Sequence, residues 1–336
     1  MGLRIGVVGG GSWGTALAGL LAGKGYAVDW WIFEKDLCTQ VRAQRENAEF
    51  LPGVQLPDTL YPTNELSDVV GGKDLVLIVV PSHVMRDVSM RINECLATHA
   101  VVVSASKGIE NNTLKTMSNV LLETLPGLDA LRLAVLSGPS FAREVALGMP
   151  TVVTVASQSN QCAEMVQQVF STTTFRVYTN TDVLGVELGG AVKNVIAIAS
   201  GMVDGLGLGL NTRAALITRG LTEIRRLGRA MGADPLTFFG SAGMGDLVLT
   251  CTGDVSRNHT VGMKIGQGIP LEKVLGRMRM VAEGVKTARS VYNLSLQLAV
   301  EMPIVHAVYR ILYEGLSPRE AAVQLMTRDL KSELDD

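Results

Sequence analysis

Three glycines near the start of the chain, Gly9, Gly11 and Gly14, have the G-x-G-x-x-G spacing of a dinucleotide-binding turn. In such a turn the first glycine makes the tight bend, the second lets the backbone approach a pyrophosphate, and the third allows close packing of helix on strand. The apolar run 5–8 and the small residues after the motif predict the flanking strand and helix. The N-terminus of that helix would direct its N–H groups and its positive dipole end at phosphates. We therefore predict a dinucleotide site here.

An acidic residue follows this motif at the distance expected for a ribose ligand. Glu34 lies twenty residues after Gly14, at the end of a strand predicted over 27–33, where a carboxylate can accept from the adenosine ribose hydroxyls. The same carboxylate would repel a 2′-phosphate, which favours NAD over NADP, although the neighbouring Lys35 can pair with such a phosphate. The alternative is a solvated charge at a strand end.

Two lysines have surroundings that favour chemistry. Lys107 directly follows the apolar strand predicted over 100–104, which puts its amine at the carboxyl edge of the sheet, where α/β sheets bind ligands. A surface lysine at a strand end is the alternative for Lys107. Lys193 lies among apolar and small residues, about one helical turn after Gly189 and Gly190, so a ligand or another backbone can approach its amine. A buried lysine needs a partner or a lowered pKa, and either suits acid–base work.

A third cluster of polar residues leads into a predicted helix. Asp246 follows a glycine-rich turn and can orient a lysine ammonium through a charge-assisted hydrogen bond. Ser256, Arg257 and Asn258 stand where the next helix begins, and a helix N-terminus combined with a planar guanidinium makes a phosphate receptor. The alternative is that Asp254 and Ser256 only cap the helix.

The order of the predicted elements indicates an α/β protein. Apolar runs predict strands over 5–8, 27–33, 74–80, 100–104, 133–136, 151–155 and 175–178, and residues 36–70 are predicted as helix, loop and short helix. After residue 182 the strand signals stop, and helices are predicted over 183–205, 213–230, 257–267, 271–276, 284–299 and 303–313. We predict a Rossmann-type doubly wound sheet in a domain of residues 1–180 and an all-helical substrate-binding domain of residues 181–336.

The composition of the whole chain excludes several classes of protein. The 336 residues carry a net charge of −2, without the basic field of a nucleic-acid-binding protein. The 4 cysteines form no C-x-x-C pair and the histidines lack metal-ligand spacing, which predicts reduced thiols in a cytoplasmic protein and no metal site. The first predicted strand begins too early to leave room for a signal peptide. Glu187 and Lys193 lie inside the apolar segment 183–203, which predicts a buried helix rather than a membrane span.

Taken in order, these motifs resemble the NAD(P)-dependent glycerol-3-phosphate dehydrogenase family in its bacterial form, over essentially the full length. The resemblance is carried by the segments 9–18, 80–83, 107–108, 138–142, 193–195, 245–258 and 283–284. It implies an oxidoreductase that reduces dihydroxyacetone phosphate to sn-glycerol 3-phosphate for phospholipid synthesis. It also implies a homodimer, and a helical domain like that of 6-phosphogluconate dehydrogenase.

The resemblance assigns roles to single residues. Lys193 matches the proton donor or acceptor at the substrate oxygen, with Lys107 and Asp246 as its active-site partners. Arg257 and Asn258 match the phosphate binders. The other predicted substrate contacts are Gly138, Ser140 and Ser256. The predicted cofactor contacts are Gly9, Gly11, Ser12, Trp13, Gly14, Ala142, Val281 and Glu283, with Lys107 and Arg257 touching both ligands.

One position departs from the bacterial pattern. Phe33 and Glu34 stand where many bacterial members carry His or Arg, and the pair looks like the NAD-specific eukaryotic members. We predict both as cofactor contacts, with NAD favoured over NADP. Two other functions are open: a dehydrogenase of the same build that acts on a hydroxy acid or sugar acid, and a cofactor-sensing binding protein without turnover. The complete set of Lys107, Lys193 and Asp246 argues against the binding protein.

Overall fold

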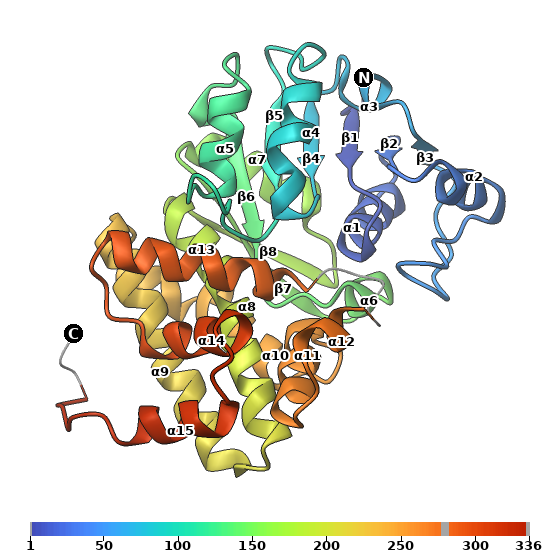
Figure 1. Cartoon of the computed structure of the whole chain (residues 1–336). Coiled ribbons are helices and arrows are strands. Elements are labelled where there is room, and N and C mark those ends of the chain that lie inside the picture. The colour runs from blue at the N-terminus through green and yellow to red at the C-terminus, as the bar shows by residue number, and fades with distance from the viewer. Residues whose placement is uncertain (1, 277–281, 334–336) are drawn as a thin grey trace. The chain divides into compact units, whose positions relative to one another are not determined.

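The computed structural model describes residues 2–276 and 282–333. The chain divides into two compact units (Figure 1), of which the first contains Met1–Lys107 and Met117–Val186 and the second contains Gly108–Thr116 and Glu187–Asp336. The short segment 108–116 thus belongs with the C-terminal residues, although the chain on both sides of it belongs to the first unit. The division into domains 1–180 and 181–336 remains our proposal.

The first unit is built on an eight-stranded sheet with the order β3-β2-β1-β4-β5-β6-β7-β8. The strands are β1 Ile5–Val8, β2 Val28–Trp31, β3 Leu60–Thr63, β4 Leu75–Ile78, β5 Val101–Ser104, β6 Leu133–Ser137, β7 Thr151–Ser157 and β8 Phe175–Asn180. β6 and β7 run antiparallel, and the other neighbouring strands in the described part of the chain run parallel. The strand order 3-2-1-4-5-6 is that of a Rossmann sheet, so the predicted fold class is confirmed.

Helices cover both faces of this sheet (Figure 1). They are α1 Ser12–Gly23, α2 Lys35–Gln44, α3 Leu66–Val70, α4 Met85–Ile92, α5 Met117–Thr124, α6 Ala142–Ala146 and α7 Asn160–Phe170. Leu17 and Leu21 of α1 and Phe170 of α7 pack on one side of the sheet, whereas α3, α4 and α5 pack on the other. Burial on both faces explains why β1 and β4 read as continuous apolar runs.

Two features of the sheet were not predicted. Residues 60–63 form β3, although the sequence favoured only helix and loop between 36 and 70. Pro62 hid this strand, because a proline within a short run argues against a strand except at a sheet edge, which is where β3 lies. The antiparallel direction of β7 was not predicted either, since the apolar pattern of a strand carries no information about its direction.

The second unit is mainly helical. Its helices are α8 Val183–Gly205, whose first residues belong to the first unit, α9 Gly209–Met231, α10 Asp246–Thr252, α11 Arg257–Gly266, α12 Leu271–Leu275, α13 Glu283–Gln297, α14 Pro303–Tyr313 and α15 Pro318–Met326. The six predicted helices are present. α8 and α14 have the predicted ends, the other four have shifted ends, and α10 and α15 are additional. α8 is long and apolar enough to cross a membrane, but 89% of its most apolar window is buried in the protein, as predicted for a core helix.

Glycines bring the backbones of α8 and α11 into direct contact. A Cβ atom placed on Gly262 of α11 would lie 1.9 Å from the carbonyl oxygen of Ile198, and one on Gly201 of α8 would lie 2.0 Å from that of His259. Cβ atoms on Gly205 and Gly266, one turn further along each helix, would lie 2.2 Å and 2.5 Å from carbonyl oxygens of the opposite helix. Only glycine fits at these four positions, which form the seam between α8 and α11. The separation of the two helices is therefore fixed by their backbones.

Candidate active site

The glycine-rich turn between β1 and α1 has the geometry that its spacing predicts. Gly9 has a φ of +132°, and a Cβ atom on it would lie 2.1 Å from the carbonyl oxygen of Val79. A Cβ atom on Gly14 would lie 2.1 Å from the carbonyl oxygen of Gly9, which allows α1 to pack against the turn. Among the described residues, a Cβ atom on Gly11 would meet no atom within 4 Å. The space beside Gly11 therefore fits a pyrophosphate that approaches the backbone.

The first turn of α1 suits an anionic ligand. Gly11 is its N-cap, and the turn Ser12–Thr15 carries no acidic side chain that would oppose the positive end of the helix dipole. The Ser12 hydroxyl donates to the carbonyl oxygen of Phe50 over 2.6 Å. The Trp13 indole Nε1 is buried and has no hydrogen-bond partner within residues 2–276 and 282–333. A bound group with an acceptor atom would satisfy that donor.

Phe33 and Glu34 follow β2 at the carboxyl edge of the sheet. Phe33 is 67% exposed, and its ring stands edge-on to that of Trp31 with centroids 5.8 Å apart. Glu34 is the N-cap residue of α2, but its exposed side chain does not cap the helix. An exposed carboxylate suits both the predicted ribose contact and a solvated charge, so the role of Glu34 remains a prediction.

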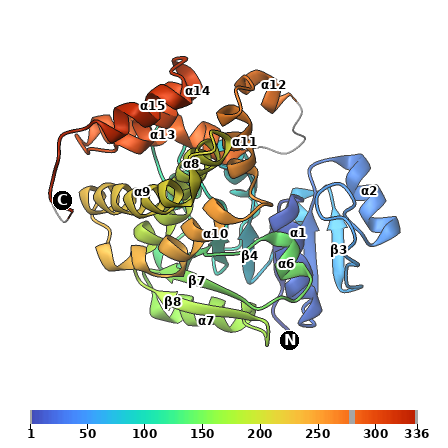
Figure 2. The same cartoon turned by 90° about the horizontal axis from the view of Figure 1, so that it is seen from below.

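Three predicted substrate residues of the first unit lie together beyond β5 and β6. The Lys107 Nζ atom donates to the carbonyl oxygen of Gly138 over 3.2 Å, and the Ser140 hydroxyl donates to the same oxygen over 2.9 Å. Gly138 has a φ of +149°, and a Cβ atom on it would lie 2.8 Å from the Cα atom of Val153, so only glycine fits there. Ala142 begins α6, which packs alongside α1 (Figure 2).

Lys193 and Asp246 form a buried ion pair in the second unit. Lys193 is 6% exposed and Asp246 is 1% exposed, and the lysine ammonium donates to the aspartate carboxylate. Lys193 Nζ also donates to the hydroxyl of Thr250 over 2.8 Å, and that hydroxyl donates to the carbonyl oxygen of Asp246 over 2.6 Å. The structure therefore brings together two predicted residues, and it adds Thr250 to the candidate site. The sequence indicates Thr250 only through its i+4 position after Asp246, which puts both residues on the same face of α10.

The neighbouring Cys251 takes no part in this chemistry. It is completely buried next to Thr250, and burial raises the pKa of its thiol to about 12. The thiol is therefore protonated at neutral pH, and a protonated thiol is a poor nucleophile. The lysine and the aspartate are the candidates for acid–base chemistry in this part of the unit.

The predicted phosphate binders begin α11. Ser256 caps the helix, because its hydroxyl accepts from the backbone N–H of His259 over 3.3 Å, so the capping alternative describes at least one role of this residue. Arg257 is the exposed first residue of the helix. The amide of Asn258 is used inside the unit: its Nδ2 donates to Asn194 Oδ1 over 2.9 Å and its Oδ1 accepts from Gly284 N over 3.0 Å.

Asn194 was missed by sequence reasoning, although it directly follows Lys193 on α8. It links the helix of the lysine to the helix of Asn258. Glu283 begins α13. Val281 lies outside the described residues, so its predicted cofactor contact stays a prediction.

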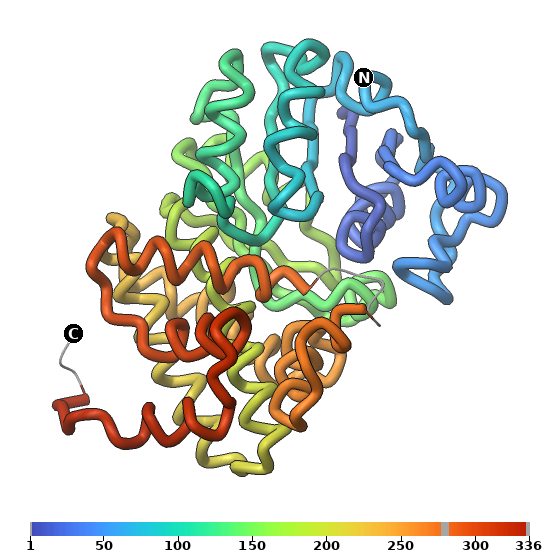
Figure 3. The backbone as a smooth tube through the Cα atoms, viewed as in Figure 1, coloured from blue at the N-terminus to red at the C-terminus, as the bar shows by residue number. Residues whose placement is uncertain are grey.

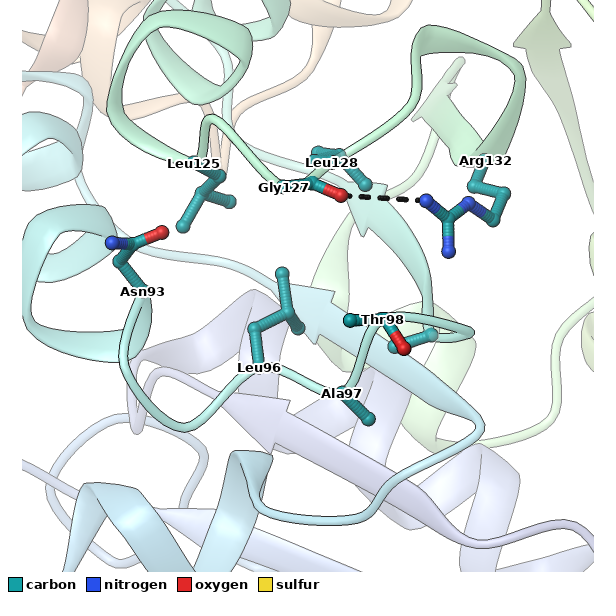
Figure 4. A pocket seen from close by; sticks show the side chains of 9 residues that line it. Asn93, Leu96, Ala97, Thr98, Leu125, Gly127, Leu128 and Arg132 are labelled. Atoms are coloured by element: carbon teal, nitrogen blue, oxygen red, sulfur yellow. Dashed lines mark hydrogen bonds between the residues drawn. The ribbon is translucent and has the colours of Figure 1, made fainter.

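A small hollow in the first unit lies away from all these residues. It is lined by Leu96, Leu125, Leu128 and Arg132 among others, and Arg132 Nη2 donates to the carbonyl oxygen of Gly127 over 3.4 Å (Figure 4). Arg132 directly precedes β6, so the hollow lies at the amino ends of the strands. Parallel sheets bind ligands at the carboxyl ends of their strands, where the glycine-rich turn and Lys107 lie.

Open space beside the second glycine of the turn suits a dinucleotide, and a buried ammonium held by a carboxylate suits proton transfer. The class of protein is therefore a dinucleotide-dependent oxidoreductase. The family model of the NAD-dependent glycerol-3-phosphate dehydrogenase N-terminus matches residues 4–163, and that of the C-terminus matches residues 182–323. The chain belongs to the NAD-dependent glycerol-3-phosphate dehydrogenase family.

Relatives and solved structures agree with this assignment. The chain is 59% identical over 333 residues to a glycerol-3-phosphate dehydrogenase [NAD(P)+] of Geobacter metallireducens, covering 99% of both chains. It is similar to the crystal structure of glycerol-3-phosphate dehydrogenase from Coxiella burnetii, with a TM-score of 0.93, 40% identity, and coverage of 97% of this chain and 99% of the other. The enzyme of Saccharomyces cerevisiae matches with a TM-score of 0.83, 27% identity, and coverage of 97% and 99%.

Proposed function

We propose that this chain catalyses the reversible reduction of dihydroxyacetone phosphate to sn-glycerol 3-phosphate with NADH or NADPH. The observation that carries the proposal is the buried ion pair of Lys193 and Asp246 in a chain of this family. A lysine ammonium is costly to bury, and an enzyme that must deliver a proton to a reduced ketone provides a reason to bury one.

Lys193 acts as the general acid. When bound, the nicotinamide supplies the hydride that reduces the ketone carbon. Lys193 gives a proton to the ketone oxygen as negative charge develops there, and takes one back in the reverse direction. Asp246 and Thr250 fix the direction of the ammonium by accepting two of its hydrogen bonds. Proton transfer by a positioned group is worth about 10²- to 10⁴-fold in rate.

The remaining predicted residues bind and orient the substrate. Lys107 adds positive charge near the developing oxyanion, which is an electrostatic contribution to catalysis. Arg257 and the N-terminus of α11 hold the phosphate, so that binding energy far from the ketone fixes its position. Gly138 and Ser140 complete the substrate contacts beside Lys107.

For the cofactor, we propose a preference for NADH. The glycine-rich turn holds the pyrophosphate, and Phe33 with Glu34 stand where the adenosine ribose is expected after β2. An exposed carboxylate at position 34 would repel the 2′-phosphate of NADPH. We also propose that the protein is a cytoplasmic homodimer that supplies glycerophospholipid synthesis, on the basis of the family and of four cysteines that are all free thiols.

The test is the initial rate of absorbance loss at the nicotinamide band with dihydroxyacetone phosphate, measured in parallel with NADH and NADPH. Turnover with NADH well above NADPH is expected. Equal turnover would keep the reaction and remove the role given to Glu34. Unphosphorylated dihydroxyacetone is the matched control for the phosphate site, and a rate that does not fall without the phosphate would contradict the role of Arg257.

A further inference from the structure

Asn47 is a completely buried polar residue that no catalytic motif contains. It lies between α2 and β3, and its side chain contacts the glycine-rich turn. Its Nδ2 donates to the carbonyl oxygen of Gly10 over 2.9 Å and to the hydroxyl of Thr15 over 2.8 Å. Its Oδ1 accepts from the backbone N–H of Phe50 over 3.1 Å. Every contact of this amide is therefore made to the turn, to α1 or to its own loop.

These contacts assign the two ends of the amide. Gly10 O can only accept and Phe50 N can only donate, so a rotated amide would set oxygen against oxygen and N–H against N–H. The hydroxyl of Thr15 agrees with this orientation, because it donates to the carbonyl oxygen of Gly11 over 2.8 Å and so offers its lone pairs to Asn47. The side chain of Asn47 thus acts on Gly10 specifically as a donor.

A donor to Gly10 also orients the next backbone N–H. The peptide unit that joins Gly10 to Gly11 is planar and trans, so the carbonyl of Gly10 and the N–H of Gly11 point in opposite directions. By holding the carbonyl on its own side, Asn47 turns the N–H of Gly11 away from itself. A Cβ atom on Gly11 would meet no atom of the described residues within 4 Å.

Glycines on both sides make this control necessary. Gly9, Gly10 and Gly11 follow one another, and glycine populates both halves of φ space about equally, so this peptide can rotate more easily than one between larger residues. If it rotated by half a turn, the carbonyl oxygen would face an arriving phosphate instead of the N–H. Like the phosphate, a carbonyl oxygen is only an acceptor, so the ligand would be repelled.

The loop that carries Asn47 follows α2 in the chain (Figure 3), and hydrogen bonds hold it in place at several points. The Ser12 hydroxyl donates to Phe50 O over 2.6 Å, and the Arg143 guanidinium of α6 donates to Pro52 O over 2.9 Å. The N–H of Leu51 donates to the carbonyl oxygen of Asn47 over 2.8 Å. A loop anchored in this way can serve as a rigid support for the turn.

We propose that Asn47 is a positioning residue for dinucleotide binding, which holds the Gly10–Gly11 peptide with its N–H toward the pyrophosphate. This role rests on the proposed function only in that the chain must bind NADH. The residue touches neither ligand, and it acts through the backbone of the turn.

The experiment compares Asn47→Ala and Asn47→Asp with the wild-type chain. The dissociation constant of NADH is measured by quenching of tryptophan fluorescence, and the KM for dihydroxyacetone phosphate is measured at saturating NADH. Gln167→Ala is the matched control, because Gln167 Nε2 donates to the carbonyl oxygen of Val177 over 2.8 Å and so joins α7 to β8, away from the turn.

Loss of the donor is expected to raise the dissociation constant of NADH about tenfold in Asn47→Ala, and at least as much in Asn47→Asp. The KM for dihydroxyacetone phosphate should stay within about twofold. Aspartate has the shape of asparagine but presents only acceptors. Asn47→Asp therefore tests the loss of the hydrogen-bond donor without a loss of side-chain volume. Wild-type affinity in Asn47→Asp, or equal changes in both constants, would overturn the proposal.

Two further outcomes are distinguishable. If the wild-type chain does not bind NADH, the proposed function fails before Asn47 is tested. If Asn47→Ala does not fold, Thr15→Val replaces it, because that change removes the second acceptor of the same amide, together with the hydrogen bonds that the Thr15 hydroxyl donates to the carbonyl oxygens of Gly10 and Gly11. Thr15→Val is expected to weaken NADH binding about threefold, and an unchanged dissociation constant would count against the proposal.

Discussion

At the scale of single residues, the burial of Lys193 is the decisive observation. Its ammonium has two partners from α10, and both orient it without removing its charge. Replacement by methionine keeps most of the volume of the side chain and removes the proton. We expect Lys193→Met to lose about 10²- to 10⁴-fold in kcat while the dissociation constant of NADH, measured by fluorescence, stays near that of the wild type.

The control for this change is another lysine–aspartate pair. Lys73 Nζ lies 2.5 Å from Asp29 Oδ2, in the first unit, near the amino ends of β4 and β2. Lys73→Met removes an ion pair of the same kind and is expected to leave kcat unchanged. Near-normal turnover in Lys193→Met, or an equal loss in Lys73→Met, would refute the assignment of the general acid.

Residue types and spacing predicted part of the candidate site. Lys193 and Asp246 could be singled out because a charge among small apolar residues and a carboxylate after a glycine turn are unusual in any fold. Thr250, Asn194 and Asn47 could not, because hydroxyl and amide side chains are common and their partners are set by the packing of helices and loops. Asn47 lies 37 residues from Gly10 in the chain, and no local pattern joins the two.

At the scale of elements, continuous apolar runs predicted the central strands, because burial on both faces leaves no place for polar side chains. Short elements at the margins escaped prediction. β3 contains a proline at the edge of the sheet, and α10 is a seven-residue helix directly after a glycine-rich turn. Direction and register depend on the partner strand, which explains why the reversal at β7 was found only in the structure.

The seam between α8 and α11 links the helix of Lys193 to the helix that begins at Arg257. A methyl group at Gly262 would lie 1.9 Å from the Ile198 carbonyl oxygen, so the two helices must separate to admit it. We expect Gly262→Ala to lower the stability by about 1–3 kcal/mol and to raise the KM for dihydroxyacetone phosphate more than that for NADH. Thermal unfolding and steady-state kinetics measure the two effects.

Gly23 is the control for this substitution, because it lies in the last turn of α1, and among the described residues a Cβ atom there meets nothing within 4 Å. Gly23→Ala should be neutral or slightly stabilising, since alanine restricts the unfolded chain. If Gly262→Ala leaves both the stability and the KM for dihydroxyacetone phosphate unchanged, the seam does not set the separation of the helices.

A buried carboxyl joins α9 to α14. Glu223 is 2% exposed and accepts from the backbone N–H groups of Ile304 over 2.6 Å and Val305 over 3.1 Å, at the start of α14. Burial raises the pKa of Glu223 from its ordinary value of 4.5 to about 8, against the opposing effect of these hydrogen bonds and of two nearby arginines. The folded state therefore binds a proton that the unfolded state releases between these two pH values.

Stability should consequently fall as the pH rises from about 4.5 to about 8 and then level off, because folding takes up a proton in that window. Glu223→Gln removes the titration. We expect the melting temperature of the wild type minus that of Glu223→Gln to decrease between pH 5.5 and pH 8.5. The exposed Glu164 of α7 gives the control, since Glu164→Gln should show no such trend. A constant difference for Glu223→Gln would contradict the prediction.

At the scale of the whole molecule, the segment Gly108–Thr116 is the unusual feature. It belongs to the second unit, where the single O–H of Ser290 on α13 is shared between two acceptors, the carbonyl oxygen of Ile109 at 3.0 Å and Asn111 Oδ1 at 2.5 Å. If the chain is expressed as two pieces, 1–181 and 182–336, the first piece carries this segment and the second carries its partner helix α13.

We expect the two pieces to elute together in gel filtration. Ser290→Ala should weaken their association, and separate elution of the wild-type pieces would contradict the prediction.

The same segment limits how this chain can exchange parts with its relatives. A single crossover near residue 181 between two parent genes would combine one parent's 108–116 segment with the other parent's α13. The bond from Ser290 to the Ile109 carbonyl survives whatever residue the first parent supplies there, because every residue has that oxygen. The bond to the side chain of Asn111 survives only where that parent also has a suitable acceptor. Productive recombinants should therefore inherit residues 108–116 and 187–336 from the same parent, which takes three crossovers rather than one.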